Sequence, residues 1–379
     1  MKPVDDQLMT CPYGVLRLQR LPRRARETLR AWDAADLYLL EDLAGNDDGP
    51  GAPLVVNDAF GALAVALHER MPVSWSDSWL SQQATRENLT LNGFAEGAVS
   101  FVDSLSVPPQ AAQVLVKLPK TLALLEDQLL RLKPQLLPQT VVRVAGMQKY
   151  MPKRVWSLLE SIIGPTETLP GRRKAKLIRV RVDESLVLPP NPYPVRYRLE
   201  DTDFELVNHA SLFSREKLDI GTRFLLEHLP QTEGPGDIVD LGCGNGVIGL
   251  MAAQRNPQAR VRLVDESFMA IASARENLKQ IDPRLERSRF TVGNVLEGFE
   301  ADCADLVLCN PPFHQQQAIG DAVVRQMFRQ TAGILRPEGE FWVVANRHLD
   351  YKKMLKRFFG RIEIPASNRK FVIYRAVAG

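Results

Sequence analysis

Long apolar runs are absent from the sequence of 379 residues, and cysteine is scarce. No apolar stretch reaches the roughly 18 residues that a membrane-spanning helix needs, and Met1 to Pro12 contains two acids and no apolar run, so we expect neither a membrane span nor a secretory signal. The four cysteines form no Cys-x-x-Cys pair, and the five histidines are dispersed. This pattern argues against a metal site and a disulfide framework, and it is typical of a reducing cytoplasm.

The composition excludes general disorder, because hydrophobic residues make up 45% and charged residues 25% of the chain. A length of 379 residues favours two domains. Four prolines lie between Leu188 and Pro194, a segment that cannot continue a helix or a central strand. We therefore expect an N-terminal domain over 1–188, a proline-rich linker over 189–195 and a C-terminal domain over 196–379.

The C-terminal half alternates between short apolar runs and helical patterns. Such alternation predicts an α/β domain with a parallel sheet, helices on both faces and a ligand beyond the carboxyl ends of the strands. The expected strands are 236–241, 261–264, 290–292, 304–309 and 340–345, and the expected helices are 247–254, 267–280 and 322–335.

The N-terminal half repeats this rhythm more faintly, with strand-like segments at 54–56, 73–75 and 114–117. The tetrapeptide Arg-Glu-Asn-Leu occurs at 86–89, after Asp77, and again at 275–278, after Asp265. We interpret this match as an internal duplication of one α/β unit, with chance identity as the alternative. The N-terminal copy has one glycine, Gly61, where the C-terminal copy has three, so we expect it to have lost cofactor binding.

The most prominent motif follows the first strand of the C-terminal half and opens a helix. Its glycines alternate as G-x-G-x-G behind an acid, which differs from the dinucleotide spacing G-x-G-x-x-G. This spacing favours a ligand without a pyrophosphate, such as S-adenosylmethionine, with the acid facing an ammonium group. The motif supplies the candidate cofactor residues Asp240, Gly242, Cys243, Gly244, Asn245 and Gly246.

Polar residues also follow the next two strands. Asp265 ends the second strand, where a carboxylate can accept hydrogen bonds from both ribose hydroxyls, and Glu266 is placed to lean over an adenine. Asn294 and Val295 follow the third strand, in a loop placed to meet the adenine edge. A plain turn is the alternative for Asn294.

The fourth strand leads into Asn310, Pro311, Pro312 and Phe313, which we expect to be catalytic. The Asn310 side-chain oxygen and the Pro311 carbonyl can accept the two hydrogens of an exocyclic amine. Such acceptors stabilise the positive charge that develops when the amine is methylated. Phe313 can stack on a flat, flipped-out base. A simple proline turn after a strand is the alternative.

These motifs together resemble the Class I S-adenosylmethionine-dependent amino methyltransferases. Longer phrases, among them 213–222, 310–316 and 344–349, look like the bacterial ribosomal RNA guanine-N2 methyltransferases. The N-terminal phrases 16–20, 57–63 and 117–126 resemble the large-subunit (23S) type more than its 16S relative. The resemblance implies two tandem Rossmann-like methyltransferase domains, of which the N-terminal one is degenerate. It also implies that Phe213, Asp219, Gly221 and Thr222 close over the cofactor, to which Asn310 contributes as well.

Basic residues cluster in two segments, although the net charge of the chain is only +3. Residues 143–181 hold ten Lys and Arg against two acids, and residues 345–379 hold nine against two. They favour a surface for a polyanion, with solvated helix faces as the alternative. The candidate RNA contacts are Arg172, Arg173, Lys174, Lys176, His314, Arg347, His348, Tyr351, Lys352 and Lys353.

The sequence therefore predicts a cytoplasmic, monomeric enzyme that methylates the N2 amine of one guanine in 23S rRNA, naked or in a precursor particle. The N-terminal domain would bind RNA. Methylation of a 16S guanine, of adenine N6 or of a protein glutamine is an alternative, because Asn-Pro-Pro followed by an aromatic residue suits any planar amine. A non-catalytic rRNA-binding assembly factor is the alternative from another class.

Overall fold

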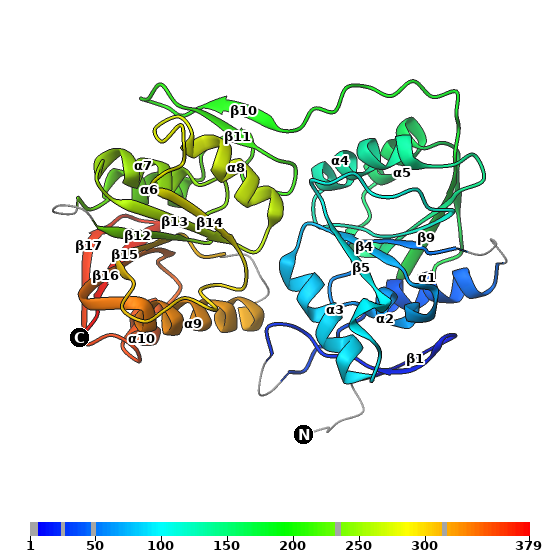
Figure 1. Ribbon diagram of the computed structural model, residues 1–379, viewed down its shortest axis with the longest axis horizontal. Helices are drawn as coiled ribbons and strands as arrows, with labels where there is room; N and C mark the ends of the chain where they lie inside the picture. The colour runs from blue at the N-terminus through cyan, green and yellow to red at the C-terminus, as the bar shows by residue number, and fades with distance from the viewer. Residues whose placement is uncertain (1–6, 24–26, 47–50, 232–235, 313–316) are drawn as a thin grey trace. The chain divides into compact units, whose positions relative to one another are not determined.

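The computed structural model describes residues 7–23, 27–46, 51–231, 236–312 and 317–379 (Figure 1). The chain divides into two compact units, residues 1–192 and 193–379, and the division falls within the proline-rich segment. Among the helices described, none is long and apolar enough to cross a membrane. The described residues also contain no group of three or more His, Cys, Asp or Glu side chains arranged to hold a metal ion.

The N-terminal unit begins with an antiparallel hairpin and continues into a seven-stranded sheet of order β5-β4-β3-β6-β7-β9-β8. The strands are β1 (Leu8–Cys11), β2 (Gly14–Arg17), β3 (Leu54–Val56), β4 (Val73–Ser76), β5 (Ser100–Asp103), β6 (Gln113–Lys117), β7 (Val141–Met147), β8 (Thr166–Thr168) and β9 (Ala175–Arg181). The α-helices are α1 (Ala34–Ala44), α2 (Ala62–Ala66), α3 (Trp79–Leu91), α4 (Leu122–Leu132) and α5 (Arg154–Ile162), and the short 3-10 helices are η2 (His68–Arg70), η3 (Glu96–Ala98), η4 (Lys133–Gln135) and η5 (Gln148–Tyr150).

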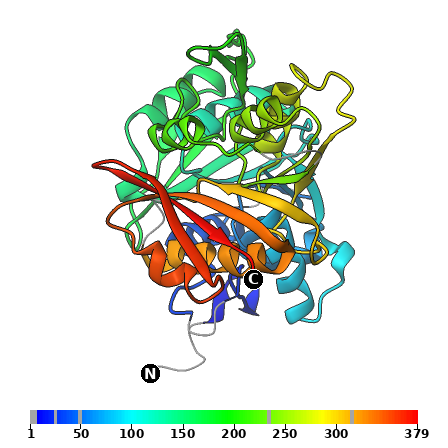
Figure 2. The same ribbon diagram turned by 90° about the vertical axis from the view of Figure 1, so that its left-hand side faces the viewer.

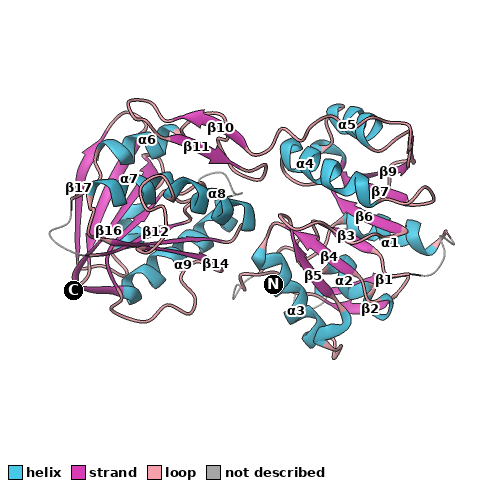
Figure 3. Ribbon diagram, turned by 45° about the horizontal axis from the view of Figure 1, so that its top comes forward, coloured by secondary structure: helices cyan, strands magenta, loops and turns pink. Residues whose placement is uncertain are grey.

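The C-terminal unit repeats this plan, with a hairpin before a sheet of order β14-β13-β12-β15-β16-β18-β17. The strands are β10 (Val195–Arg198), β11 (Glu205–Asn208), β12 (Asp237–Leu241), β13 (Arg260–Asp265), β14 (Ser288–Val292), β15 (Ala304–Cys309), β16 (Leu335–Asn346), β17 (Arg361–Ser367) and β18 (Phe371–Val377). The helices are α6 (Ile220–Glu227), α7 (Val247–Arg255), α8 (Phe268–Leu278), α9 (Gln317–Ile334) and α10 (Tyr351–Leu355). Helices cover both faces of each sheet (Figure 3).

The two sheets have the same strand order, and this confirms the prediction of two tandem Rossmann-like domains. The first five strands of each sheet are parallel, as the sequence predicts. A wholly parallel sheet was, however, the wrong expectation, because each sheet ends in an antiparallel hairpin, β8–β9 in one unit and β17–β18 in the other. Figure 2 shows the second of these hairpins in red.

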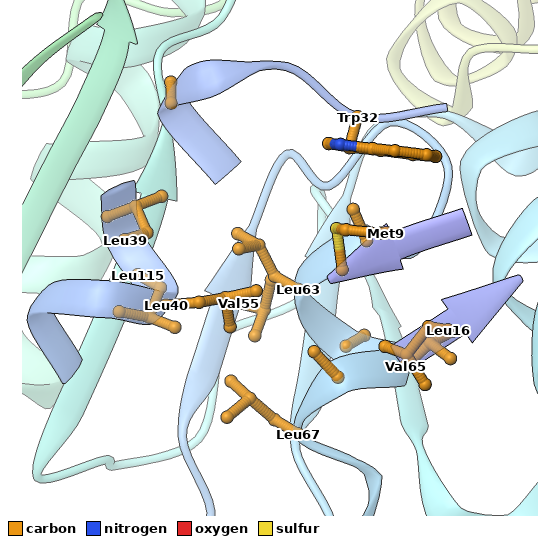
Figure 4. Packing of buried hydrophobic residues seen from close by; sticks show 14 of the residues in the cluster. Met9, Leu16, Trp32, Leu39, Leu40, Val55, Leu63, Val65, Leu67 and Leu115 are labelled. Carbon is orange, nitrogen blue, oxygen red and sulfur yellow. The ribbon is translucent and has the colours of Figure 1, made fainter. Parts of the chain in front are cut away.

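Each sheet is buried on both faces, and successive side chains of its central strand serve opposite faces. In β3, Val55 joins one apolar cluster, while Leu54 and Val56 join the other. Figure 4 shows the first of these clusters, in which Val55 lies beside Leu63 and Leu40. In β12, Ile238 and Val239 likewise belong to different clusters. This two-sided burial explains why these strands occur as short continuous apolar runs in the sequence.

The repeated tetrapeptide has the same structural role in both units. Asn88 donates through its amide to the carbonyl of Phe60, and Asn277 donates to the carbonyl of Asn245, both at 2.8 Å. Each of these carbonyls precedes the glycine that starts the first helix after the central strand. Each asparagine also binds the backbone at the hairpin that begins its unit. Asn88 binds Gln19, which follows β2, and Asn277 binds Val207, which lies in β11. The matching contacts support the interpretation of an internal duplication.

Candidate active site

The glycine-rich loop between β12 and α7 depends on backbone conformations that only glycine adopts easily. Gly242, Gly244 and Gly246 have φ values of 68°, 54° and 76°. A Cβ on Gly246 would lie 2.7 Å from the Cβ of Ala274, so this glycine lets α7 approach α8. A Cβ on Gly244 would meet no described atom within 4 Å. The loop is therefore tightly packed at its helical end and open at Gly244, where a ligand can approach the backbone.

Asp240 is a buried carboxylate placed directly before this loop. Its Oδ2 accepts a hydrogen bond from the Gly249 amide at 2.8 Å, while its Oδ1 is buried without a partner among the described residues. Burial raises the pKa of Asp240 to about 7, and the nearby charge of Asp265 adds to the shift. A buried carboxylate with one oxygen unbonded suits a cationic ligand group such as an ammonium.

Asp265 connects the glycine-rich loop to the second strand of the sheet. Its side chain accepts hydrogen bonds from the Gly244 amide at 2.9 Å and from the Ser267 amide at 3.0 Å. Burial raises the pKa of this carboxyl group. Glu266 beside it is half-buried. The carboxylate thus lies at the edge of the sheet, where the sequence analysis predicts that it accepts hydrogen bonds from the ribose hydroxyls.

The other predicted cofactor residues make contacts within the protein. Asn245 donates through Nδ2 to Asn208 Oδ1 at 2.9 Å and accepts from the Val247 amide at 3.2 Å, so its side chain supports the loop. Asn294 donates to Glu297 at 3.1 Å. The remaining members are Cys243, which is 4% exposed and whose thiol pKa is raised well above its usual range by burial, and Val295, which has a φ of 55°.

Asn310 follows β15 and is held by the first turn of α6. Its Nδ2 donates to Thr222 Oγ1 at 2.7 Å and to Asp219 Oδ2 at 3.1 Å. Asp219 also caps α6, because the same oxygen accepts the Thr222 amide at 2.9 Å. A carboxylate can only accept hydrogen bonds, so it requires the NH2 side of the Asn310 amide to face it.

The opposite side of the Asn310 amide is left as an acceptor. Asn310 Oδ1 is buried and has no hydrogen-bond partner among the described residues. Gly221 lies close to this cluster, because a Cβ on it would lie 3.1 Å from Asp219 Oδ2 and 3.7 Å from Asn310 Oδ1. A buried carbonyl oxygen without a donor is costly, and a bound N–H group would satisfy it.

The topology of the sheet brings these groups to one edge. The chain runs from β12 outward through β13 and β14, then returns to the other side of β12 at β15. The carboxyl ends of β12, β13 and β15 therefore carry Asp240, Asp265 and Asn310 around the point where strand order reverses. This crevice is where open α/β sheets bind their ligands.

The residues flanking Asn310 differ in exposure. Pro311 is buried and Pro312 is exposed. Phe213, expected over the cofactor, is 72% exposed. Phe313 and His314 lie outside the described residues.

The predicted RNA contacts divide into exposed and buried residues. Arg172 and Arg173 are exposed and form ion pairs with Glu41, at 3.1 and 3.4 Å. Tyr351 is 4% exposed and packs edge-on against Phe328 with ring centres 5.3 Å apart, so it belongs to the core instead of the surface that the sequence predicted. The other members are Lys174, Arg347, His348, Lys352 and Lys353, which are exposed, and Lys176, which is half-buried.

Comparisons with known proteins give matches over both halves of the chain. A family model described as the RLMG N-terminal domain matches residues 6–184, and one described as the methyltransferase small domain matches residues 203–375. The ribosomal RNA large subunit methyltransferase G of Streptomyces avermitilis is 46% identical over 377 residues, which cover 97% of this chain and 98% of the relative. The protein of the same name from Erwinia tasmaniensis is 48% identical over 368 residues, covering 96% and 97% of the two chains.

A solved structure shares the fold over nearly the whole chain. The T. thermophilus 16S rRNA N2 G1207 methyltransferase (RsmC), in complex with AdoMet and guanosine, has a TM-score of 0.75 at 20% sequence identity. The match covers 98% of this chain and 97% of that one.

Proposed function

The chain belongs to the ribosomal RNA large subunit methyltransferase G family, and on this premise we propose that Asn310 holds the N2 amine of one guanine in 23S rRNA for methylation. The protein is an S-adenosylmethionine-dependent rRNA methyltransferase. S-adenosylmethionine supplies the methyl group as an electrophilic carbon on a sulfonium. The chain's own residues bind the two partners and orient the amine.

The observation that carries the proposal is the orientation of the Asn310 amide. Its NH2 group is engaged by Asp219 and Thr222, and its Oδ1 is a buried acceptor without a partner among the described residues. An acceptor at that place binds an N–H group and excludes a carbonyl, which has no hydrogen to donate. The guanine N2 amine meets this requirement, whereas guanine O6 does not.

Accepting a hydrogen bond also assists the chemistry. The lone pair of a guanine amine is delocalised into the ring, and the nitrogen becomes positive as it is methylated. A fixed carbonyl dipole next to the N–H stabilises that charge, and little reorganisation is needed because Asn310 is already held in place. We propose that the Pro311 carbonyl is the second acceptor, since the proline ring fixes its backbone.

The cofactor residues are proposed from the groups at the same sheet edge. Asp240 Oδ1 is available to an ammonium group, and Gly244 leaves room for the backbone of an amino acid moiety. Asp265 is proposed to accept the ribose hydroxyls, although it also supports the loop through the Gly244 amide. These features fit S-adenosylmethionine, because its amino acid end carries the positive charge that a buried carboxylate binds well.

The N-terminal unit is proposed to bind RNA, in line with its exposed basic residues. A cytoplasmic, monomeric enzyme remains our prediction, and the four cysteines are unpaired, as a reducing compartment requires.

The proposal is tested by incubating the protein with labelled S-adenosylmethionine and either protein-free 23S rRNA, protein-free 16S rRNA or assembled subunits. We expect label in 23S rRNA, and nuclease digestion followed by mass spectrometry should identify N2-methylguanosine. Label in N6-methyladenosine or in 16S rRNA would replace the proposed substrate. Binding of rRNA without any transfer would instead support the assembly-factor alternative.

A further inference from the structure

The hairpin that ends the N-terminal sheet has a basic tip. Between β8 and β9, Arg172 and Ala175 exchange two backbone hydrogen bonds, at 3.0 and 2.8 Å, and enclose a two-residue turn. The turn residues are Arg173 and Lys174, and both are exposed. We call residues 172–175 the N-terminal tip.

The hairpin that ends the C-terminal sheet has a matching tip, which sequence reasoning missed. Between β17 and β18, the Asn368 amide donates to the Phe371 carbonyl at 2.9 Å. The residues between them are Arg369 and Lys370, so the dipeptide Arg-Lys occupies the same place in both units. Both residues are exposed. We call residues 368–371 the C-terminal tip.

Both tips are attached in the same way to the loop that follows the fifth strand of their sheet. The Gln148 amide donates to the Lys174 carbonyl at 2.8 Å, and the Arg347 amide donates to the Lys370 carbonyl at 3.0 Å. Each loop brings further cations to its tip, Lys149 in one unit and Arg347 itself in the other. The two units therefore carry the same basic surface at the same position of the fold.

The N-terminal tip adopts a strained backbone conformation. Arg173 and Lys174 have φ values of 47° and 65°, in the left-handed region. Two-residue hairpin turns with two such residues strongly favour Asn and Gly, because a side chain there costs roughly 1–2 kcal/mol per residue. Two long cationic side chains are thus retained where the turn geometry alone would favour smaller residues. Retained strain of this kind points to a role for the side chains themselves.

Beside the N-terminal tip lies an open cavity of about 410 Å³. It is lined by Met151, Lys153, Trp156 and Lys176. The Trp156 indole is half-buried and anchored, because its Nε1 donates to Thr168 Oγ1 at 2.8 Å. The Lys176 ammonium lies 5.4 Å from the centre of the indole ring. An anchored aromatic ring with one lysine over it and a second lysine lining the same cavity can bind an unpaired nucleobase and its phosphates.

Other basic residues of the same segment serve the fold. Arg143 is 1% exposed and pairs with Asp42 at 2.7 Å, and Arg179 pairs with the same carboxylate at 2.5 Å. Arg143 is therefore not part of the exposed surface, and Arg179, whose side chain is 25% exposed, has Asp42 as its partner. The exposed cations next to this pair are those of the N-terminal tip.

We propose that the two hairpin tips are equivalent contacts for RNA phosphates, and that the N-terminal tip adds a pocket in which an unpaired base stacks on Trp156. This inference rests on the proposed function, since the RNA is the enzyme's substrate. Phosphate contacts set affinity and register without reading sequence, whereas the stacked base requires a single-stranded segment.

The experiment measures binding of the full-length protein to a short fluorescein-labelled single-stranded RNA and to the matching duplex, by anisotropy over a range of salt concentrations. Trp156→Ala should weaken single-strand binding roughly tenfold and leave duplex binding nearly unchanged, while Trp156→Phe should retain most of the affinity. The charge-removing pairs R173A/K174A and R369A/K370A should each weaken both probes and lower the salt dependence of binding.

The matched control for charge is K279A/R284A, which removes two exposed cations near the C-terminal end of α8. It should change binding less than either tip variant. Equal effects of the control and the tip variants would overturn the proposal, because only net charge would then matter. Equal loss of single-strand and duplex binding in Trp156→Ala would refute the stacking pocket.

A strain-relieving variant separates function from folding. R173N/K174G gives the turn its preferred residues, so thermal unfolding should move to higher temperature while RNA binding weakens as in the alanine pair. Unchanged RNA binding in this stabilised variant would contradict the proposal. Methylation of 23S rRNA by the wild type is measured in parallel. If methylation proceeds but the tip variants bind RNA normally, this inference fails alone; if no rRNA is methylated, the proposed function fails.

Discussion

Lys117 in the N-terminal unit and Asn310 in the C-terminal unit occupy equivalent positions but do different work. Lys117 directly follows Val116, the last residue of β6 that pairs with the central strand β3. Asn310 directly follows Cys309, the last residue of β15 that pairs with the central strand β12. Each also binds the residue that caps the helix before that sheet, Asp33 in one unit and Asp219 in the other. The comparison shows that one scaffold supports an ion pair in the N-terminal unit and an amide held by hydrogen bonds in the C-terminal unit.

The two clusters also differ in their third residue, which is Asp36 in the N-terminal unit and Thr222 in the C-terminal unit. Lys117 binds Asp33 at 2.7 Å and Asp36 at 2.8 Å, whereas Asn310 binds an aspartate and the hydroxyl of Thr222. The two carboxylates raise the pKa of Lys117, and burial raises the pKa of Asp36 to about 6. An ammonium has donors only, so Lys117 provides no acceptor at the position where Asn310 has an Oδ1 without a partner among the described residues.

The two units have the same helix packing next to these clusters. Gly61 and Gly246 begin equivalent helices with φ values of 81° and 76°. A Cβ on either would lie 2.7 Å from an atom of the equivalent residue of the next helix, Thr85 or Ala274. The packing of helix against helix therefore depends on glycine in both units, whether or not a cofactor is bound.

The two carboxylates proposed to bind the cofactor have no counterpart at the equivalent positions of the N-terminal unit. Aligning the two helix-starting glycines places Val55 at the position of Asp240. Ser78 and Ser267 cap equivalent helices, and counting back two residues from each places Ser76 opposite Asp265. The structure thus pairs Asp265 with Ser76, one residue before the Asp77 that precedes the repeated tetrapeptide. The N-terminal unit thus has no carboxylate at either of these two positions. Its loss of cofactor binding stays a prediction.

The largest effect is expected from Asn310→Ala, which removes the acceptor that we propose for the amine and that Lys117 cannot supply. The turnover number should fall by about a thousandfold, because a preorganised acceptor is lost from the transition state. Binding of S-adenosylmethionine, measured by calorimetry, should remain nearly unchanged. A variant with the full rate would show that Asn310 has no part in the reaction.

The equivalent change in the other unit, Lys117→Met, should affect stability instead of catalysis. Removing the cation leaves the buried carboxylate of Asp36 and the exposed carboxylate of Asp33 without their partner. We expect a loss of about 3 kcal/mol in the free energy of unfolding of the N-terminal unit, mainly from Asp36. Denaturant titration measures this loss. At a temperature where the variant is folded, its turnover number should match the wild type, and a large drop would mean that the N-terminal cluster contributes to the reaction.

Thr222→Val should produce a smaller catalytic effect. It removes one of two acceptors that orient the Asn310 amide while keeping the size of the side chain, so we expect the turnover number to fall about tenfold with little change in KM for the cofactor. Thr222→Ser keeps the hydroxyl and should restore activity. If the serine variant is as slow as the valine variant, packing and not the hydrogen bond explains the loss.

The smallest expected effect is a dependence of stability and cofactor affinity on pH. It arises from Asp240, whose equivalent in the N-terminal unit is Val55. The folded pKa of Asp240 is raised to about 7, so the native state holds a proton that the unfolded chain releases near pH 4. The stability of the cofactor-free protein should therefore decrease as the pH rises from about 4 to about 7.

An ammonium group needs the ionised carboxylate, so the affinity for S-adenosylmethionine should increase several-fold as the pH rises through about 7. Calorimetry between pH 6 and 8 checks this trend, and Asp240→Asn serves as the comparison because it cannot ionise. A wild-type affinity as independent of pH as that of the variant would contradict the role given to Asp240.

The parts of the fold that the sequence predicted well are those with strong local signals. The strands β3 and β15 have the predicted bounds because each is a short apolar run buried on both faces. The terminal hairpins were missed, since β17 is largely exposed and its short alternation of polar and apolar side chains, from Arg361 to Ile364, is interrupted by Pro365. Edge strands form by pairing with a neighbour, and that neighbour is not visible in the local sequence.

The candidate site was predicted in the same uneven way. Asp240, Asp265 and Asn310 were found because each directly ends or follows an apolar strand. Tyr351 was misplaced, because its position after a strand suggested a surface loop while its ring packs in the core. Arg369 and Lys370 went unnoticed because the hairpin that presents them was not predicted.

The sequence by itself determined which chemical groups this protein has and the order in which they end the strands, since short apolar runs and glycine turns are local features. Only the tertiary structure decided which atom of Asn310 remains available. Its amide nitrogen is bonded to residues 88 and 91 positions earlier in the chain, and its oxygen is left without a donor among the described residues. The direction of a hydrogen bond between such distant residues depends on how α6 packs beside the sheet, and no local pattern encodes that packing.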